Sequence, residues 1–263
     1  MRSLNIAATG MLAQQTNVEV ISNNIANMNT TAYTRRRPEF SDLLYQNLRR
    51  VGAQSSDAGT IVPTGVQLGL GVKTTAVYRI TEQGSVQNTD NTLDLAIQGK
   101  GYFRILLPSG ETAYTRDGSF QLSAEGKIVT HEGYTVQPEI SIPAGTVGVT
   151  IDATGQVIIK LDGQVQTQVK GQLTLATFPN EAGLEARGDN LYLETPASGQ
   201  PVVNPPGKAG TGTGTILQGF LETSNVNVVS EITNLISAQR AYEMNSKVIQ
   251  ASDEMLSTIN QVK

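Results

Sequence analysis

The sequence contains no cysteine and only one histidine among its 263 residues. Without cysteine, disulfide bonds, thiolate nucleophiles and cysteine-ligated metal sites are all excluded. The single histidine, His131, lies beside Glu132-Gly133 in a predicted hairpin turn, and the sequence places no second ligand or nucleophile next to it. We therefore expect a solvent-facing side chain at His131, no metal, no cofactor and no catalytic residue.

The sequence also has few charges and no long hydrophobic run. Charged residues make up 16% of the chain, and the net charge of -4 provides no positive field for nucleic acid or anionic lipid. No apolar run approaches the length that spans a membrane, and residues 1–20 lack the apolar core and cleavage site of a secretory signal. We expect no nucleic-acid partner, no membrane insertion and, if the protein is exported, a route without a cleaved signal peptide.

Two terminal segments carry a seven-residue hydrophobic repeat, which is typical of coiled coils. The predicted seam residues near the amino terminus are Leu4, Met11, Val18, Ile21, Ile25 and Met28. Those near the carboxy terminus are Val228, Leu235, Tyr242, Ile249 and Leu256. Asn227 is a suitable N-cap for the second helix. The chain enters its middle from one helix and leaves it through the other, so a pairing of the two is expected to be antiparallel.

The energetics indicate that these helices need more than one partner. Burying the six large apolar residues of the first seam contributes roughly 10 to 18 kcal/mol, whereas fixing about thirty backbone residues costs roughly 1 to 2 kcal/mol each. Gly10 costs about 1 kcal/mol relative to alanine in a helix, which a close approach of backbones there would offset. We expect both termini to be loose in the free monomer and to become ordered when several copies pack together.

Between the helices the hydrophobic period changes to two. In residues 71–80, Val72, Thr74 and Tyr78 share one face and Lys73 and Thr75 share the other, as in a half-buried strand. Turn signals then follow at short intervals and predict antiparallel hairpins. These signals are Ser109-Gly110, Asp117-Gly118, Glu125-Gly126, Glu132-Gly133, Thr154-Gly155 and Asp162-Gly163.

These patterns predict an α+β fold, with long N- and C-terminal helices forming a coiled-coil domain and a mostly antiparallel β domain. The expected boundaries are 1–35 for the N-terminal helix, 36–70 for a connecting region, 71–222 for the β domain and 223–263 for the C-terminal helix. Residues 196–215 are rich in Gly and Pro, and we expect a loop or linker there.

Two short motifs have some features of ligand sites but lack others. Asp90 and Asp94 are spaced as in a calcium loop, but Leu95 stands where that loop needs glycine and no terminal glutamate follows. The tripeptide Gly99-Lys100-Gly101 has the glycines of a phosphate cradle, but it precedes a predicted strand instead of opening a helix. We expect no calcium site at the first motif and a tight turn or bulge at the second.

Two polar clusters are candidates for contacts between subunits. The candidate residues are Asn23, Asn24, Asn27, Arg35, Arg36 and Arg37. The three arginines suit an acidic neighbouring subunit or solvent better than peptidoglycan or nucleic acid, because the chain is acidic overall. The asparagines suit either a solvated helix face or amide hydrogen bonds across subunits.

Both ends of the chain resemble the flagellar rod and hook family of axial proteins. The opening SLNIAATGMLAQQTNVEVISNNIANMNTTAY is similar to the family's amino-terminal rod signature, including its Asn-rich core. The closing ETSNVNVVSEITNLISAQRAYEMNSKVIQASDEML is similar to its carboxy-terminal partner. Ala32 departs from the pattern, since the family often has glycine in this turn.

Further segments resemble the distal rod branch of the family more than its hook or proximal rod branches. They are DLLYQ (42–46), GAQSS (52–56), PTGVQLGLGV (63–72), AYTRDGSF (113–120) and GLEARGDNLYLET (183–195). The stretch around 46–65 is similar to the one that distinguishes the stiff rod from the bendable hook. Its candidate residues are Gln46, Gly52, Gln54, Ser55, Pro63 and Gly65.

The resemblance implies a structural subunit that polymerises into a rigid helical tube, with the terminal helices on its inner wall around a central export channel. It also implies a place in the basal body, across the periplasm toward the outer membrane, and export by the flagellar type III apparatus. The implied partners are other copies of the chain, proximal rod proteins, the hook protein and the periplasmic and outer-membrane bushing rings. Two alternatives remain open, namely a hook or proximal rod subunit and a β-rich peptidoglycan-acting or carbohydrate-binding module.

Overall fold

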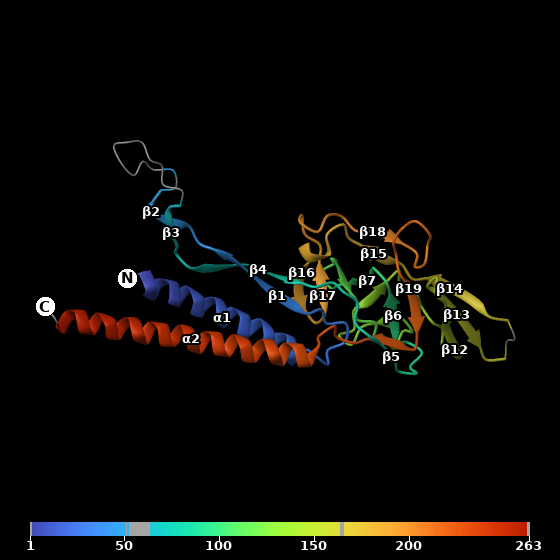
Figure 1. Cartoon of the computed structure of the whole chain (residues 1–263). Helices are drawn as coiled ribbons and strands as arrows, with labels where there is room; N and C mark the ends of the chain where they lie inside the picture. Colours follow the sequence, from blue (N-terminus) through green and yellow to red (C-terminus); the bar gives the residue numbers. More distant parts are fainter. Residues whose placement is uncertain (1, 51, 53–63, 164–165, 262–263) are drawn as a thin grey trace. The chain divides into compact units, whose positions relative to one another are not determined.

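The chain divides into two compact units, each built from segments that are distant in the sequence. The computed structural model describes residues 2–50, 52, 64–163 and 166–261. The helical unit contains Met1–Ala26, Arg36–Arg79 and Asn227–Lys263, and the β unit contains Asn27–Arg35 and Ile80–Val226. The chain therefore passes from one unit to the other four times (Figure 1).

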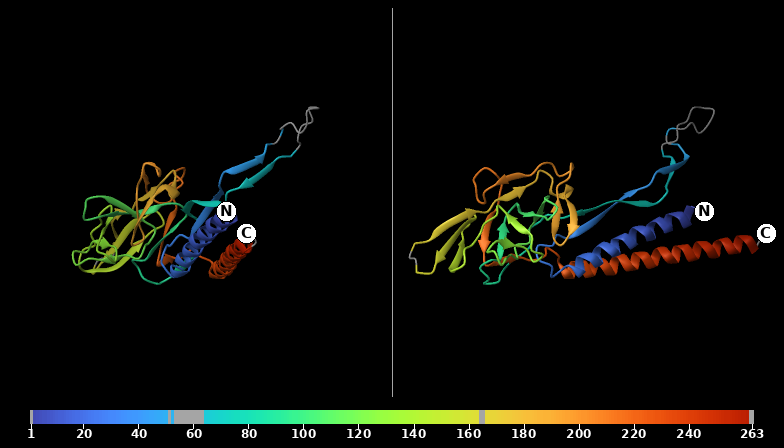
Figure 2. Two further views of the ribbon diagram at one scale, coloured as in Figure 1. Left: turned by 90° about the vertical axis from the view of Figure 1, so that its left-hand side faces the viewer. Right: turned by 180° about the vertical axis from the view of Figure 1, so that it is seen from behind.

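Two long helices dominate the helical unit. Helix α1 (Arg2–Ala26) and helix α2 (Val228–Gln261) run side by side in opposite directions, and both chain ends lie together at the same end of the pair (Figures 1 and 2). The predicted antiparallel pairing is confirmed. The predicted N-cap is also confirmed, because the side-chain oxygen of Asn227 accepts a hydrogen bond from the backbone N–H of Ser230 at 3.1 Å.

Helix α1 ends at Ala26, earlier than the predicted boundary at residue 35. The backbone N–H of Thr30 donates a hydrogen bond to the carbonyl oxygen of Asn27 at 3.1 Å. The hydroxyl of Thr30 donates to the side-chain oxygen of Asn27, also at 3.1 Å. Polar side chains that bond to nearby backbone in this way compete with helical hydrogen bonds. The residues after Ala26 therefore form turns, and Met28 lies outside the helix.

The rest of the helical unit is an extended β arm. Strand β1 (Arg36–Asp42) pairs with β4 (Val72–Arg79), and β2 (Tyr45–Arg49) pairs with β3 (Val66–Gly69), all antiparallel. The strand predicted in residues 71–80 is present as β4, but it is mostly exposed and belongs to the helical unit, although we expected it to begin the β domain. The reason is that its hydrogen-bonding partner β1 comes from the region that we expected to be only a connection.

The β unit is built around one large antiparallel sheet. Its described strands run in the order β16-β17-β8-β7-β11-β10-β9, and β15 pairs with both β7 and β18. Their bounds are β7 (Tyr102–Leu106), β8 (Thr112–Thr115), β9 (Gln121–Leu122), β10 (Ile128–Val129), β11 (Thr135–Gln137), β15 (Leu175–Thr177), β16 (Glu185–Gly188), β17 (Leu191–Leu193) and β18 (Val202–Asn204). A short 3-10 helix, η1 (Glu181–Gly183), precedes β16.

Smaller antiparallel sheets complete the β unit. Strands β12, β13 and β14 form one, β6 pairs with β19, and β5 pairs with β20. Their bounds are β5 (Val86–Asn88), β6 (Leu95–Gln98), β12 (Thr146–Ile151), β13 (Gln156–Leu161), β14 (Gln168–Gln172), β19 (Thr215–Gln218) and β20 (Phe220–Glu222).

Five of the six predicted turn signals connect paired antiparallel strands. Their glycines adopt positive φ angles, which residues with a Cβ rarely adopt. These glycines are Gly110, Gly126, Gly133, Gly155 and Gly163, with φ between 73° and 85°. Gly118 serves another purpose, since a Cβ there would lie 1.6 Å from the carbonyl oxygen of Leu95. It permits a close approach of two backbones instead of closing a hairpin.

The core of the β unit lies between its sheets. Fully buried side chains from the large sheet, such as Phe103 and Ile105, belong to the same cluster as Val157 and Ile159 of β13. The rings of Phe103 and Phe120 meet edge to face, with centroids 5.1 Å apart. Together these contacts form one continuous apolar core.

The predicted linker at 196–215 is part of the β unit. Strand β18 lies inside it and pairs with β15, and the N–H of Gly214 donates to the carbonyl oxygen of Lys100 at 2.7 Å. Composition alone pointed to irregular structure here, but pairing with a distant strand satisfies the hydrogen bonds of the backbone.

No helix in the described part of the chain is long and apolar enough to cross a membrane.

Candidate assembly surface

The register of α1 against α2 follows from two contacts. Asn24 of α1 bonds to Glu231 of α2, and Gly10 faces Asn245. In both contacts the two residue numbers add to 255, so the same register holds along the pair. It places Ser3 opposite Ser252 at the far end.

Small and polar residues occupy the line along which the two helices meet. On α2 this row has a seven-residue spacing and consists of Glu231, Ala238, Asn245 and Ser252. Glu231, Ala238 and Ser252 are buried, and Asn245 is half-buried. A Cβ added to Gly10 would lie 2.9 Å from Nδ2 of Asn245, so the close approach predicted at Gly10 is present, with a side chain instead of backbone as the neighbour.

Asn24 ties three segments of the helical unit together. Its side chain is 1% exposed. The amide nitrogen donates to the backbone carbonyl of Arg36 at 2.8 Å and to Oε2 of Glu231 at 3.2 Å, while the amide oxygen accepts from the backbone N–H of Arg36 at 2.8 Å. The amide of Asn24 therefore bonds within the chain, and we no longer consider it a candidate for contacts between subunits.

The predicted seam residues flank this small and polar row instead of forming it. Only Ile21 is buried, because the small side chains bring the helices closest along their own row. Most of the others are half-buried, namely Leu4, Met11, Val18, Ile25, Val228, Leu235, Ile249 and Leu256. Met28 and Tyr242 are exposed.

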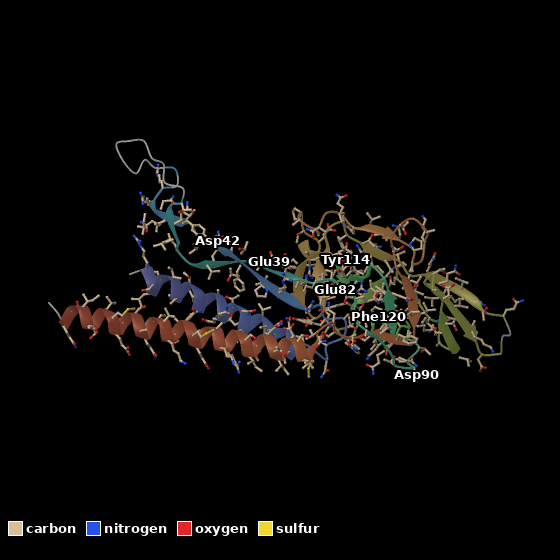
Figure 3. The ribbon with its side chains drawn as sticks, in the orientation of Figure 1. Glu39, Asp42, Glu82, Asp90, Tyr114 and Phe120 are labelled. Carbon is tan, nitrogen blue, oxygen red and sulfur yellow. The ribbon has the colours of Figure 1, made fainter. Side chains whose placement is uncertain are left out.

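Large apolar side chains lie exposed along both helices. A groove beside the helix pair is lined by Val18, Glu19, Gln239, Tyr242 and Glu243, together with Gln15. The exposed large apolar residues of the helices are Ile6, Leu12, Val229, Ile232, Ile236, Tyr242, Met244, Val248, Met255 and Ile259. Figure 3 shows side chains projecting outward along both helices. Exposed large apolar side chains that gather on the same two helices are typical of an interaction surface.

The other polar candidates have varied surroundings. Asn23 is exposed and Asn27 is half-buried. The backbone N–H of Arg35 donates to the side-chain oxygen of Asn225 at 2.7 Å. Arg36 and Arg37 are exposed on β1, where the guanidinium of Arg37 lies 5.9 Å from the ring centroid of Tyr78.

Three of the candidate residues in the stretch similar to the rod-specific one are described, and they lie on or next to the β arm. Gln46 is exposed on β2, Gly52 has a φ of 78°, and Gly65 is half-buried just before β3. Gln54, Ser55 and Pro63 lie outside the described residues. The β arm also presents acidic side chains, since Glu39 and Asp42 are exposed on β1 (Figure 3). A hydrogen bond with Asp42 and its negative charge raise the pKa of Tyr45.

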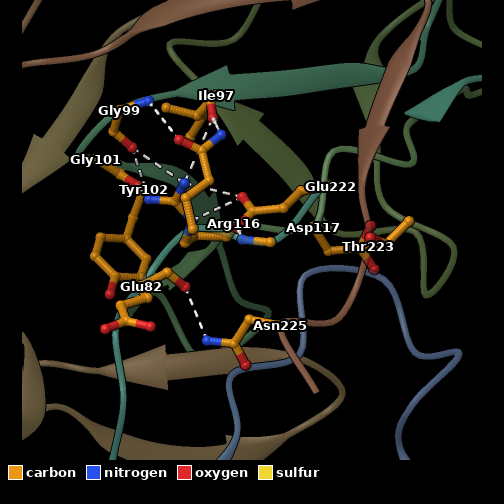
Figure 4. A network of polar contacts seen from close by, with 12 residues as sticks. Glu82, Ile97, Gly99, Gly101, Tyr102, Arg116, Asp117, Glu222, Thr223 and Asn225 are labelled. Atoms are coloured by element: carbon orange, nitrogen blue, oxygen red, sulfur yellow. Dashed lines mark hydrogen bonds and ion pairs between the residues drawn. The ribbon is translucent and has the colours of Figure 1, made fainter. Parts of the chain in front are cut away.

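A buried ion pair in the β unit escaped the sequence analysis. The guanidinium of Arg116 lies 2.9 Å from the carboxylate of Glu222 and also donates to the carbonyl oxygens of Ile97, Gly99 and Gly101 (Figure 4). The Gly99 turn thus presents carbonyl oxygens to a cation, the opposite of a phosphate cradle. The only available signal was an arginine next to the Asp117-Gly118 turn, which does not reveal a partner at residue 222.

The motifs that we rejected as ligand sites have local structural roles. His131 is exposed in a turn, and its Nδ1 lies 3.1 Å from the amide nitrogen of Gln121. The carboxylate of Asp94 accepts hydrogen bonds from Thr89 and Asn91. Among the described residues, no group of three or more His, Asp and Glu side chains is arranged to hold a metal ion.

Comparison with protein families gives matches at both ends and in the middle of the chain. Residues 4–34 match the model described as "Flagella basal body rod protein" and residues 217–262 match "Flagellar basal body rod FlgEFG protein C-terminal". Residues 96–159 match "Flagellar hook protein FlgE/F/G D1 domain". The three matches follow the same order as the helix, sheet and helix of the structure.

Several curated proteins are similar over the whole chain. The flagellar basal-body rod protein FlgG of Caulobacter vibrioides is 61% identical over 263 residues, which is 100% of both chains. The FlgG protein of Agrobacterium fabrum is 53% identical over 99% of this chain and 98% of its own. The FlgG protein of Buchnera aphidicola subsp. Schizaphis graminum is 48% identical over 99% of both chains.

Proposed function

This chain belongs to the FlgG family of flagellar basal-body rod proteins, and we propose that its copies assemble into the distal rod through the apolar faces of α1 and α2. The chain is a structural subunit of the rod in the flagellar basal body. Its copies polymerise into a rigid helical tube that transmits motor torque to the hook and leaves a central export channel. The protein acts mechanically, and we propose no catalytic activity for it.

The observation that carries this proposal is the composition of the line between the helices. Because Ala238, Asn245 and Gly10 lie along it, most of the large apolar side chains of α1 and α2 are left half-buried or exposed. Neither helix gains enough burial from the other to offset the entropy of ordering more than twenty residues. Neighbouring copies supply the missing apolar contacts.

The remaining partners follow from the place of the rod in the basal body. Proximal rod proteins and the hook protein contact its two ends, and the periplasmic and outer-membrane bushing rings surround it. The protein spans the periplasm toward the outer membrane after export by the flagellar type III apparatus. Asn23, Asn27 and the arginines 35–37 remain candidates for polar contacts between subunits, and the β arm around Gln46 for bracing the rod.

A test of assembly through the helices compares two single substitutions in α1. Leu12 is exposed, and Leu12→Asp places a charge in the apolar face, whereas Asn5→Asp adds the same charge at an exposed polar position. We expect Leu12→Asp to abolish polymerisation of the purified protein and motility, and Asn5→Asp to leave both intact. Polymerisation of the Leu12→Asp protein at the normal rate would contradict the proposal.

The state of the free monomer provides a second test. We expect limited proteolysis of the dilute monomer to remove both termini early and to leave the β unit. A full-length monomer that resists protease would contradict folding on assembly.

Two further observations would favour the alternative functions. Curved and compressible tubes would indicate a hook subunit, and digestion of peptidoglycan by the purified monomer would indicate an enzyme.

A further inference from the structure

Helix α2 extends beyond the start of α1 in the helical unit (Figures 1 and 2). The register that pairs Asn24 with Glu231 places Arg2, the first residue of α1, opposite Asp253. Residues 254–261 therefore form an overhang of about two turns, roughly 12 Å long, without an α1 residue opposite them.

The overhang carries exposed apolar side chains that a partner helix could cover. Met255 is 59% exposed and Ile259 is 64% exposed. Ile259 is seven residues after Ser252, so it continues the row that α1 covers along the rest of α2. The face of α2 that contacts α1 therefore extends past the start of α1. A helix from another molecule could pack against this part of the face.

A second unpartnered apolar surface lies at the other end of α2. Val229, Ile232 and Ile236 are exposed, and their spacing of three and four residues places them on one face of the helix. We call them the outward stripe. It ends after the first turns of α2, because Glu243 and Gln250 occupy the positions that continue it.

We propose that the overhang of one copy packs against the outward stripe of the next copy along the rod. This inference rests on the proposed function, since it names the contact by which copies polymerise. The two surfaces are different parts of one helix, so the contact is heterologous and does not close into a dimer. Repetition of this contact builds an open row of subunits.

The distance between the two surfaces sets the geometry of the row. Ile232 and Ile259 are 27 positions apart on one helix. At 1.5 Å per residue they are separated by about 40 Å, so they cannot touch within one molecule. Copies joined by this contact are displaced by about 40 Å along α2, and their α2 helices run parallel.

The absence of cysteine from the sequence allows a direct test by disulfide cross-linking. A variant with Ile232→Cys and Ile259→Cys is expressed as the sole copy in flagellated cells, and isolated basal bodies are oxidised and run on a non-reducing gel. Because a disulfide needs Cα atoms within about 7 Å, it can form only between copies. We expect a ladder of multimers, with at most dimers for either single variant.

A matched control moves one cysteine along the same face. The variant with Gln250→Cys and Ile259→Cys keeps the overhang cysteine but places the other outside the outward stripe, and we expect no ladder. Rods that assemble without a ladder in the first variant would overturn this contact while leaving the proposed function intact. Failure of the unmodified chain to polymerise would overturn the proposed function instead.

A charge pair provides a second measurement if the cysteine variant does not assemble. We expect Ile232→Lys and Ile259→Glu each to reduce motility at least tenfold and their combination to restore part of it. The combination of Gln250→Lys with Ile259→Glu should restore none. Equal motility of the two combinations would overturn the proposed contact.

Discussion

The side-chain amide of Asn24 lies 3.2 Å from the carboxylate of Glu231, which is 207 residues later in the chain. Both side chains are buried. A polar pair inside a helix interface favours one register, because a shift along the helices would leave both groups buried without a partner. The pair fixes the overhang at one end of α2 by setting the register at the other.

Asn24→Asp should separate the helices at this point. The substitution removes the amide donor that serves Glu231 and Arg36 and places a second carboxylate next to the first. We expect a loss of more than about 3 kcal/mol in the stability of the helix pair, measured as a lower depolymerisation temperature of rods. Ser22→Asp adds the same charge at an exposed position of α1 and should change little.

The same site allows a partial rescue. Adding Glu231→Gln to Asn24→Asp restores an amide opposite a carboxylate, so part of the stability should return. The carbonyl of Arg36 would still lack its donor, and recovery should be incomplete. No difference between the single and the double variant would show that the contact does not fix the register.

Gly10→Leu should weaken the helix pair through a steric clash with Asn245. Alanine at position 245 leaves room for the new side chain, so adding Asn245→Ala to Gly10→Leu should recover stability. Leucine also favours the helix over glycine by close to 1 kcal/mol. Rod depolymerisation measures the stability of all three variants. A loss in the double variant equal to the sum of the losses in the two single variants would contradict the close approach of Gly10 to Asn245.

Ala32 adopts a left-handed conformation with φ of 54°, in the turn where the resemblance led us to expect glycine. We expect Ala32→Gly to change the stability of the β unit by less than about 1 kcal/mol, because relief of strain offsets the lost methyl contact. Ala32→Val should cost more than about 2 kcal/mol, since a β-branched residue rarely tolerates positive φ. Urea unfolding measures the stability of both variants. Equal stability of the two would contradict the left-handed conformation of residue 32.

Arg116→Met should destabilise the β unit by about 3 to 5 kcal/mol. The change leaves the buried carboxylate of Glu222 without its cation and the carbonyl oxygens of Gly99 and Gly101 without their donor. Because those carbonyls remain, the double variant with Glu222→Met should not regain full stability. The control is Lys127→Met, which removes an ion pair with Glu139 at the surface and should change the stability of the β unit little.

Tyr114 should make the β unit sensitive to alkaline pH. Burial and the nearby carboxylate of Glu194 raise the pKa of Tyr114 above its ordinary value of 10.0. The folded state holds this proton more tightly than the unfolded state, so the contribution to stability is complete below pH 10 and is lost as pH rises through the folded pKa. Tyr114→Phe should reduce the loss of stability above pH 10, and an unchanged alkaline unfolding curve would contradict this role.

Local sequence signals predicted most element types correctly. The heptad spacing of residues such as Val18 and Leu235 predicted two terminal helices, and the order of the chain made their pairing antiparallel. Turn pairs such as Glu125-Gly126 predicted hairpins, because positive φ at glycine is a local property. Asn227 was recognisable as a helix cap for the same reason.

Choices between distant partners could not be predicted in this way. The heptad pattern favoured Met11 and Ile249 at the helix interface, whereas the structure places the row of Gly10 and Asn245 there. Periodicity ranks positions by hydrophobicity, but the distance between two helices depends on how small the facing side chains are. The membership of β4 in the helical unit likewise depended on β1, a strand with no distinctive pattern of its own.

The sequence by itself determined the two helices, the antiparallel hairpins and the resemblance to a family, since each depends on residues that are close together along the chain. Only the tertiary structure decided the partner of Arg116, the burial of Asn24 and the overhang of α2. These features depend on which surfaces fit together after the chain has folded. Steric fit and the need to satisfy buried polar groups act between residues that are distant in the sequence.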